Sequence, residues 1–236
     1  MIRCLHGFLG TGDDWAPFSE AFRSASGMRV ECPDLFAEPS NEPLADFAVR
    51  FTRPSGSVLI GYSMGGRIAL RSLLRRPDAF RAAVIISAGL GIADPDERRR
   101  RIDSDASWAR RFEVEPWPQL IAAWNEQSVF GGSALPMPRE ESARLNRDAL
   151  AAALRSWSPG RDARLGSSDL QKVSCPVLWV AGERDSKYAA EARAAVLSLP
   201  RGAHWLAPGA GHRVPWEAPD TFRERVSNFL ADALSR

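Results

Sequence analysis

The 236-residue chain is poor in the residues that build disulfide-linked or metal-bound domains. It contains three cysteines and three histidines. An odd cysteine count without a C-x-x-C pair argues against a disulfide scaffold or a zinc site, and it fits a reducing compartment. We therefore expect no metal and no cofactor. We interpret Cys4 and Cys175, which lie in or beside apolar runs, as buried core residues.

Long hydrophobic runs and an excess of charge are also missing. No apolar run is long enough to cross a bilayer, and residues 1–6 do not form the apolar part of a signal peptide. The formal net charge is +2, which gives no reason to expect nucleic acid or a membrane surface as a partner. We expect a cytoplasmic protein with neither partner. The sequence leaves the oligomeric state open between a monomer and a weak dimer.

The remaining composition is that of a globular domain, with 44% hydrophobic and 25% charged residues. Short β-branched or apolar runs alternate with helical patterns, which predicts an α/β fold with a mostly parallel, doubly wound sheet of about six strands. The expected strands are residues 2–5, 28–34, 58–60, 82–88, 176–182 and 203–207. The expected helices are residues 15–22, 44–51, 67–74, 189–199 and a last one from about 220.

The alternation stops between residues 89 and 165. Helical patterns interrupted by prolines fill this stretch, and no strand-like run occurs in it. We predict a helical cap at 89–165, inserted into a core formed by 1–88 and 166–236. Such lids exclude water and shape substrate pockets. We interpret the arginine run 98–101 as a solvated helix face and the four tryptophans of this stretch mainly as cap core: Trp108, Trp117, Trp124 and Trp157.

One stretch carries a chemical signature. Residues 61–66 read Gly-Tyr-Ser-Met-Gly-Gly between an apolar run and a helical run, which is the strand–turn–helix context of the G-x-S-x-G nucleophile elbow. A side chain at Gly61 or Gly65 would crowd the crossing of strand and helix. The elbow predicts an exposed, reactive Ser63 and leaves the amide of Met64 available to an oxyanion.

A histidine and an acid follow in the order that such sites require. Asp185 lies after the strand predicted at 176–182, and His212 lies in a glycine-rich loop after the last strand. The carboxyl ends of parallel strands gather at one edge, so we predict a Ser63–His212–Asp185 triad. Glu183 and Asp169 are rivals for the acid.

The loop after the first strand, His6-Gly7-Phe8, predicts the second oxyanion donor at the Phe8 amide, with His6 in a structural role. The triad allows two chemistries. Ser63 can attack a carbonyl and form an acyl-enzyme. Alternatively, activated Ser63 can remove a proton α to a carbonyl while the amides of Phe8 and Met64 hold the enolate. The triad residues do not choose between them.

The chain resembles the MenH family of α/β-hydrolase-fold proteins, which are 2-succinyl-6-hydroxy-2,4-cyclohexadiene-1-carboxylate synthases of menaquinone biosynthesis. The resemblance extends over nearly the whole chain. It is carried by His6–Gly10 with Trp15, by Gly61–Arg67, by the cap segment Ser104–Phe112, by Trp124 and Val129-Phe130, by Gly182–Lys187 and by Ala210–His212.

The resemblance implies a lyase reaction. In it, the serine activated by the His–Asp pair removes a proton from 2-succinyl-5-enolpyruvyl-6-hydroxy-3-cyclohexene-1-carboxylate, and pyruvate is expelled. That substrate is a small tricarboxylate, which requires fixed cations. By position, the family's substrate-binding residues correspond to Tyr62, Arg67, Arg101, Trp124, Arg144 and Lys187. Arg147 competes with Arg144 for one of the cap positions.

Two other interpretations stay open from the residues. One is a serine hydrolase, cleaving an ester or a carbon–carbon bond through a Ser63 acyl-enzyme. The other is a non-catalytic binding protein that keeps the fold. A cavity shared by Ser63, Arg67, Arg101 and Lys187 would favour the lyase over both.

Overall fold

The computed structural model describes residues 1–131, 139 and 145–235. Its centre is a sheet in the order β2-β1-β3-β4-β5-β6 in which every neighbouring pair is parallel. The predicted parallel sheet of about six strands is thereby confirmed. The strands are β1 (Ile2–Leu5), β2 (Val30–Glu31), β3 (Ser57–Tyr62), β4 (Phe80–Ile86), β5 (Val177–Gly182) and β6 (Gly202–Ala207).

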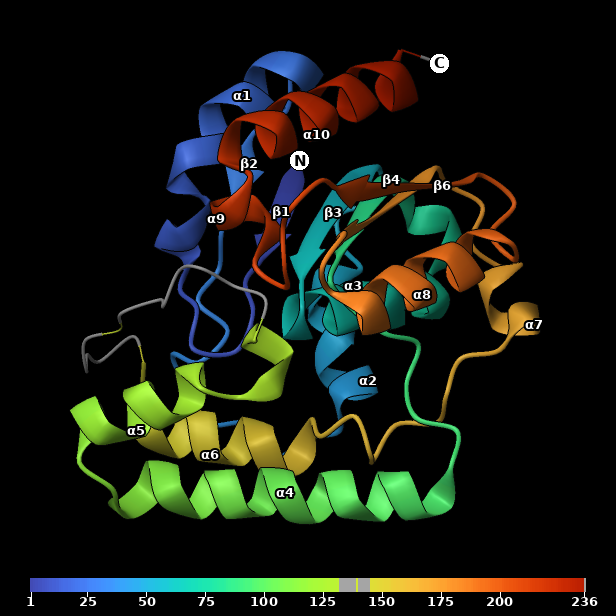
Figure 1. Cartoon of the computed structure of the whole chain (residues 1–236). Coiled ribbons are helices and arrows are strands. Elements are labelled where there is room, and N and C mark those ends of the chain that lie inside the picture. The colour runs from blue at the N-terminus through green and yellow to red at the C-terminus, as the bar shows by residue number, and fades with distance from the viewer. Residues whose placement is uncertain (132–138, 140–144, 236) are drawn as a thin grey trace.

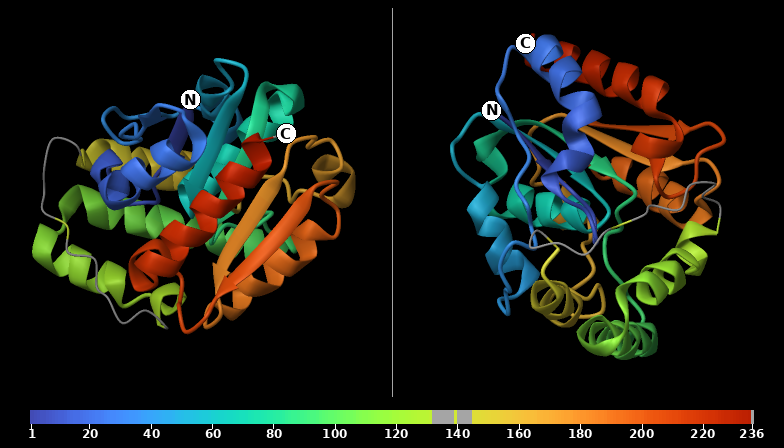
Figure 2. Two further views of the ribbon diagram at one scale, coloured as in Figure 1. Left: turned by 90° about the horizontal axis from the view of Figure 1, so that it is seen from above. Right: turned by 90° about the vertical axis from the view of Figure 1, so that its left-hand side faces the viewer.

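Helices cover both faces of this sheet because the central strands bury side chains on both sides. The pair α1 (Ala16–Ser26) and α10 (Pro219–Leu234) lies on one face, as both views of Figure 2 show. In β3, Val58 and Ile60 point to that face, and Leu59 points to the other. The opposite face carries α2 (Leu44–Phe47), α3 (Met64–Arg75) and α8 (Ser186–Val196).

A second group of helices falls between β4 and β5 in the chain. It comprises α4 (Pro95–Val114), α5 (Trp117–Asn125) and α6 (Arg147–Ser156), which form a separate layer beyond the sheet (Figure 1). The layer lies at the end toward which β3 points, so it faces the carboxyl edge where a site was predicted. We call α4, α5 and α6 the cap; its exact limits at residues 89 and 165 stay a prediction.

Several expected elements differ in extent. The strand predicted at 28–34 shrinks to Val30–Glu31, because Pro33 cannot donate to a ladder and the loop instead bonds to the turn after β1. The helix predicted at 44–51 is α2 followed by the 3₁₀ turn Ala48–Phe51. The helix predicted at 189–199 starts earlier, at Ser186, since the side chain of Asp185 caps it.

Five further elements of the described residues are short. They are α7 (Ser167–Leu170), α9 (Val214–Glu217) and the 3₁₀ turns Gly12–Trp15, Pro77–Ala79 and Ser128–Phe130. Within the described residues, no helix combines the length and the apolar character needed to span a membrane.

Candidate active site

The turn between β3 and α3 holds Ser63 in a strained conformation. Its φ is +52°, a region that side chains with a Cβ rarely adopt. The glycines around it permit the crossing. A Cβ on Gly61 would lie 2.4 Å from the carbonyl oxygen of Gly65, and a Cβ on Gly65 would lie 2.2 Å from that of Leu5. The turn therefore requires glycine at both positions, as the motif predicted.

Three residues distant in sequence form one hydrogen-bonded chain at this edge. His212 Nε2 lies 3.2 Å from Ser63 Oγ, and His212 Nδ1 lies 2.7 Å from Asp185 Oδ2. Both partners of the second bond are buried, with side chains 3% and 7% exposed. With Nδ1 donating to the carboxylate, Nε2 is left to accept the serine proton. The structure thus brings the three predicted triad residues together.

The rival acids lie elsewhere. Glu183 Oε2 accepts the amide of Gly209, and Asp169 caps α7 and pairs with Lys172. The third histidine of the chain, His204, is exposed on β6 and does not contact Ser63. The close approach of two chain segments explains why Asp185 meets His212: a Cβ on Gly182 would lie 2.0 Å from the carbonyl oxygen of Gly211.

The two predicted oxyanion donors face the same space. Phe8 and Met64 both line the cavity that contains Ser63. In the described part of the chain, neither amide donates a hydrogen bond to the backbone or to a side chain. Two unpaired amides beside a serine hydroxyl match the requirements of an oxyanion hole.

His6 fixes the loop that carries Phe8. The imidazole is fully buried, its Nδ1 donates to the carbonyl oxygen of Gly7, and its Nε2 accepts the amide of Leu35, both at 2.9 Å. Burial lowers the pKa of His6 from 6.5 to about 4, so the ring is neutral near pH 7 and can accept and donate at once. This geometry agrees with the structural role predicted for it.

A cavity of about 430 Å³ opens above Ser63. It is lined by every described residue that was predicted to bind substrate: Tyr62, Arg67, Arg101, Trp124 and Lys187. The sequence did not single out several other lining residues: Ser87, Arg184, Tyr188, Gln127 and Ser128. Arg184 and Tyr188 adjoin the expected site residues Asp185 and Lys187, and Ser87 follows the end of β4. These positions were the only signal in the sequence for them.

Aromatic rings enclose the triad from the cap side. Phe130 packs edge-on against His212, with ring centroids 5.7 Å apart. The Trp124 ring packs at a tilt against Phe8, with centroids 4.6 Å apart, and edge-on against Trp108, with centroids 4.9 Å apart. These contacts join the cap to the loop after β1 and shield the histidine from bulk water.

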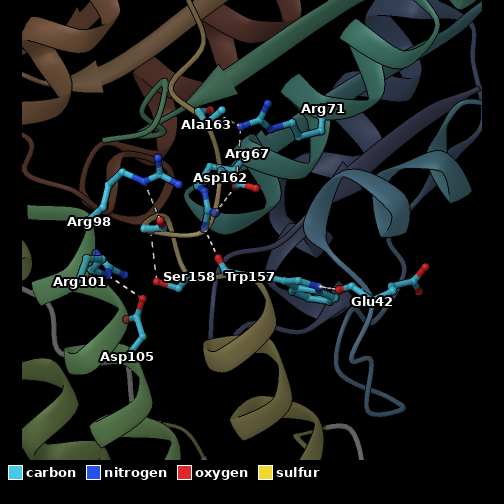
Figure 3. Close-up of polar contacts among 11 residues, drawn as sticks. Glu42, Arg67, Arg71, Arg98, Arg101, Asp105, Trp157, Ser158, Asp162 and Ala163 are labelled. Carbon is cyan, nitrogen blue, oxygen red and sulfur yellow. Dashed lines mark hydrogen bonds and ion pairs between the residues drawn. The ribbon is translucent and has the colours of Figure 1, made fainter. Parts of the chain in front are cut away.

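The cations of the cavity differ in how they are held. Arg67 donates from Nη2 to Asp162 Oδ2 at 2.6 Å and from Nη1 to the carbonyl oxygen of Trp157 at 2.7 Å (Figure 3). Arg101 Nε donates to Asp105 Oδ2 at 2.8 Å. Lys187 is exposed, and no ion pair is seen for it within the described residues. The sequence did not predict either aspartate as a partner.

The remaining cap arginine was predicted as Arg144, with Arg147 as its competitor. Arg144 lies outside the described residues. Arg147 starts α6 and donates to the carbonyl oxygens of Phe112 and Glu115, at the end of α4. Arg147 is absent from the lining of the cavity, so its described contacts serve the packing of the cap.

The sequence pattern of the Alpha/beta hydrolase family matches residues 4–225. The 2-succinyl-6-hydroxy-2,4-cyclohexadiene-1-carboxylate synthase of Pectobacterium atrosepticum is 32% identical over 97% of this chain and 92% of that protein.

Solved structures show the same fold. MenH from S. aureus superposes with a TM-score of 0.82 at 22% identity, covering 98% of this chain and 93% of that one. A thermophilic esterase from Thermogutta terrifontis superposes with a TM-score of 0.73 at 21% identity, covering 98% and 89%. At these identities the likeness shows the fold alone, and the fold hosts more than one activity. From the matched pattern and the curated relatives, this chain belongs to the α/β hydrolase family and, within it, to the family of 2-succinyl-6-hydroxy-2,4-cyclohexadiene-1-carboxylate synthases.

Proposed function

We propose that this protein is a lyase that eliminates pyruvate from 2-succinyl-5-enolpyruvyl-6-hydroxy-3-cyclohexene-1-carboxylate to give 2-succinyl-6-hydroxy-2,4-cyclohexadiene-1-carboxylate. One observation carries the proposal beyond family membership. A single cavity contains the Ser63–His212 pair together with the cationic side chains of Arg67, Arg101 and Lys187. A simple ester needs the first group and has no use for the second.

In this proposal Ser63 acts as a base. His212 takes the hydroxyl proton through Nε2, and Asp185 stabilises the imidazolium and keeps its tautomer. The serine oxygen then removes a proton α to a carbonyl of the substrate. The electron pair moves through the ring, the carbon–oxygen bond to the enolpyruvyl group breaks, and that group leaves and takes up a proton as pyruvate.

The backbone supplies the electrostatic part of the reaction. Charge develops on the substrate carbonyl oxygen as the proton leaves. The amides of Phe8 and Met64 are free to donate to that oxygen, and they cost no reorganisation because the elbow and the loop held by His6 fix them in advance.

The cationic groups hold the substrate in place. We infer that its carboxylates bind near Arg67, Arg101 and Lys187, with Tyr62 and Trp124 against the ring. Burial raises the pKa of Tyr62 above its ordinary value, so its hydroxyl stays protonated and adds no charge to the pocket. The cap then acts as a lid that excludes water, which would otherwise compete for the developing charge.

The second candidate is a serine hydrolase, because the same triad can form an acyl-enzyme and an esterase shares the fold. The two differ in what the cavity must attract. The basic side chains of Arg67, Arg101 and Lys187 favour an anionic substrate, and the lyase is the candidate that uses these three.

Pyruvate release tests the proposal. The purified protein is given the enolpyruvyl substrate, and pyruvate is measured by reduction with NADH and lactate dehydrogenase, in parallel with hydrolysis of p-nitrophenyl acetate. We expect pyruvate release that far exceeds ester hydrolysis. Fast ester hydrolysis without pyruvate release would favour the hydrolase over the lyase. The absence of both activities would favour a non-catalytic binding protein.

A further inference from the structure

The segment Trp157–Asp162, between α6 and β5, approaches the active site from the cap side. Arg67 donates to both ends of it, to the carbonyl oxygen of Trp157 and to the carboxylate of Asp162 (Figure 3). Arg67 lies one helical turn after Ser63, whose carbonyl oxygen accepts its amide at 3.1 Å. The position of this segment therefore decides where the guanidinium points relative to Ser63.

Other contacts keep the segment in one place. The indole of Trp157 donates to the carbonyl oxygen of Glu42 at 3.1 Å, and Arg98 Nε donates to the carbonyl oxygen of Gly160 at 2.9 Å. A Cβ on Gly160 would lie 2.4 Å from the carbonyl oxygen of Arg98, so only glycine permits this approach. The segment is thus tied to α4 and to the core, and it serves as a fixed support for Arg67.

The charges of Arg67 and Asp162 at this support also bear on ligand binding. The side chains of Arg67 and Asp162 are only 12% and 15% exposed, and a buried cation without a counter-charge is costly. Arg71 contributes a second, more distant cation, 3.9 Å from the same carboxylate oxygen. Asp162 therefore neutralises Arg67 in the free protein, although Arg67 lines the cavity for an anionic substrate.

We propose that Asp162 is a positioning and affinity-setting residue: it holds one side of the Arg67 guanidinium and weakens the attraction of Arg67 for a substrate carboxylate. The donors of Arg67 that Asp162 and Trp157 do not use remain for the ligand. Arg101 repeats the arrangement on α4, where the carboxylate of Asp105 is only 4% exposed. Lys187, with no such partner seen in the described chain, supplies the uncompensated charge. The inference rests on the proposed function for the substrate but concerns dicarboxylate binding in general.

Replacement of Asp162 by asparagine separates charge from position. The amide oxygen in Asp162→Asn can still accept from Arg67, while the negative charge is gone. We expect the dissociation constant of succinate, measured by calorimetry without turnover, to fall about tenfold. The KM for the enolpyruvyl substrate should fall by a similar factor. A merely structural role would lower the active fraction, and with it kcat, and would leave KM unchanged.

Further variants show whether the effect runs through Arg67. In an Arg67→Gln background, Asp162→Asn should improve succinate binding far less than in the parent, because no guanidinium remains to be released and only the repulsion by the carboxylate is lost. Asp162→Ala, which removes the acceptor as well, should weaken succinate binding. Asp220→Asn is the matched control, since Asp220 pairs with Arg223 at 2.7 Å but is 84% exposed on α10. If Asp162→Asn does not fold, Asp162→Ser offers the same loss of charge with an acceptor retained.

Three results would overturn the proposal. They are an unchanged succinate affinity in Asp162→Asn, a weakened one, and a gain of the same size in the Arg67→Gln background. Failure of the lyase assignment is a separate result. If the parent protein releases no pyruvate, the proposed function is wrong, but the succinate titration still tests the roles of Arg67 and Asp162.

Discussion

The two walls of the cavity are built in different ways. On the core side, backbone contacts place the reactive groups: the elbow, the Phe8 loop and the Gly182–Gly211 approach each leave no room for a Cβ. The basic groups of the cavity, Arg67 and Lys187 from the core helices α3 and α8 and Arg101 from α4, form what we call the cap wall. Side-chain contacts hold its two arginines: Arg67 pairs with Asp162, 95 positions later in the sequence, and Arg101 with Asp105, four positions later on α4. In the proposed function, the core wall supplies the reaction machinery and the cap wall selects the substrate.

The largest expected effect comes from a substitution in the core wall. Ser63→Ala should lower kcat/KM for pyruvate release at least about a thousandfold, because the base is lost while binding groups remain. Succinate affinity should stay near that of the parent protein, since the cations are untouched. Steady-state kinetics and calorimetry measure both, with the exposed Ser24→Ala as control. Retention of turnover would remove Ser63 from the mechanism.

The next effect concerns the stability of the core wall. The pKa of His6 is about 4 in the folded protein and close to 6.5 in an unfolded chain. Below pH 6.5 the unfolded state binds a proton that the folded state refuses. Stability present above pH 6.5 is therefore lost as the pH falls toward 4, by about 3 kcal/mol from this group.

Urea unfolding at a series of pH values between these limits checks this expectation. His6→Gln cannot titrate, so its free energy of unfolding should fall less steeply with acid than that of the parent. Parallel slopes for the two proteins would show that burial does not perturb His6.

A smaller effect is expected from substitutions of basic residues in the cap wall. Arg67→Gln and Lys187→Gln should each raise the KM for the tricarboxylate, by about tenfold for a charge-assisted contact. We expect different secondary effects. Arg67→Gln leaves Asp162 buried beside a neutral partner and should also lower the melting temperature, whereas Lys187 is exposed and its replacement should not. Equal melting temperatures would mean that the Arg67–Asp162 pair adds no stability.

The smallest effect comes from salt. Raising the ionic strength from about 0.05 M to about 0.5 M screens exposed charges, so KM should rise a few-fold in the parent protein. Most of that dependence should vanish in Lys187→Gln, because Arg67 is buried and paired. A salt dependence that survives in Lys187→Gln would assign the attraction to other cations.

The contrast between the walls also explains what the sequence predicts. Ser63, Asp185 and His212 each follow a strand, and a parallel sheet brings such positions to one edge whatever the details of packing. The parallel sheet and the elbow glycines were predicted for the same reason. Position along the chain was sufficient because backbone geometry decides these features.

The cap wall depends on information that local patterns do not contain. Arg67 was predicted to face the cavity, but its pairing with Asp162, 95 positions later, follows from the path of the segment Trp157–Asp162. The strand predicted at 28–34 shortened for a related reason: Asp34 and Leu35 bond to the turn after β1 instead of a neighbouring strand. Tertiary partners decided each of these features.

The most direct test of the division between the walls compares two reactions in one variant. In the double variant Arg67→Gln/Lys187→Gln, pyruvate elimination and p-nitrophenyl acetate hydrolysis are measured on the same preparation. We predict that kcat/KM for elimination falls about a hundredfold while ester hydrolysis stays within a few-fold of the parent, because the core wall is intact. A parallel fall of both activities would contradict the division, since the basic residues would then support the triad itself and not the choice of substrate.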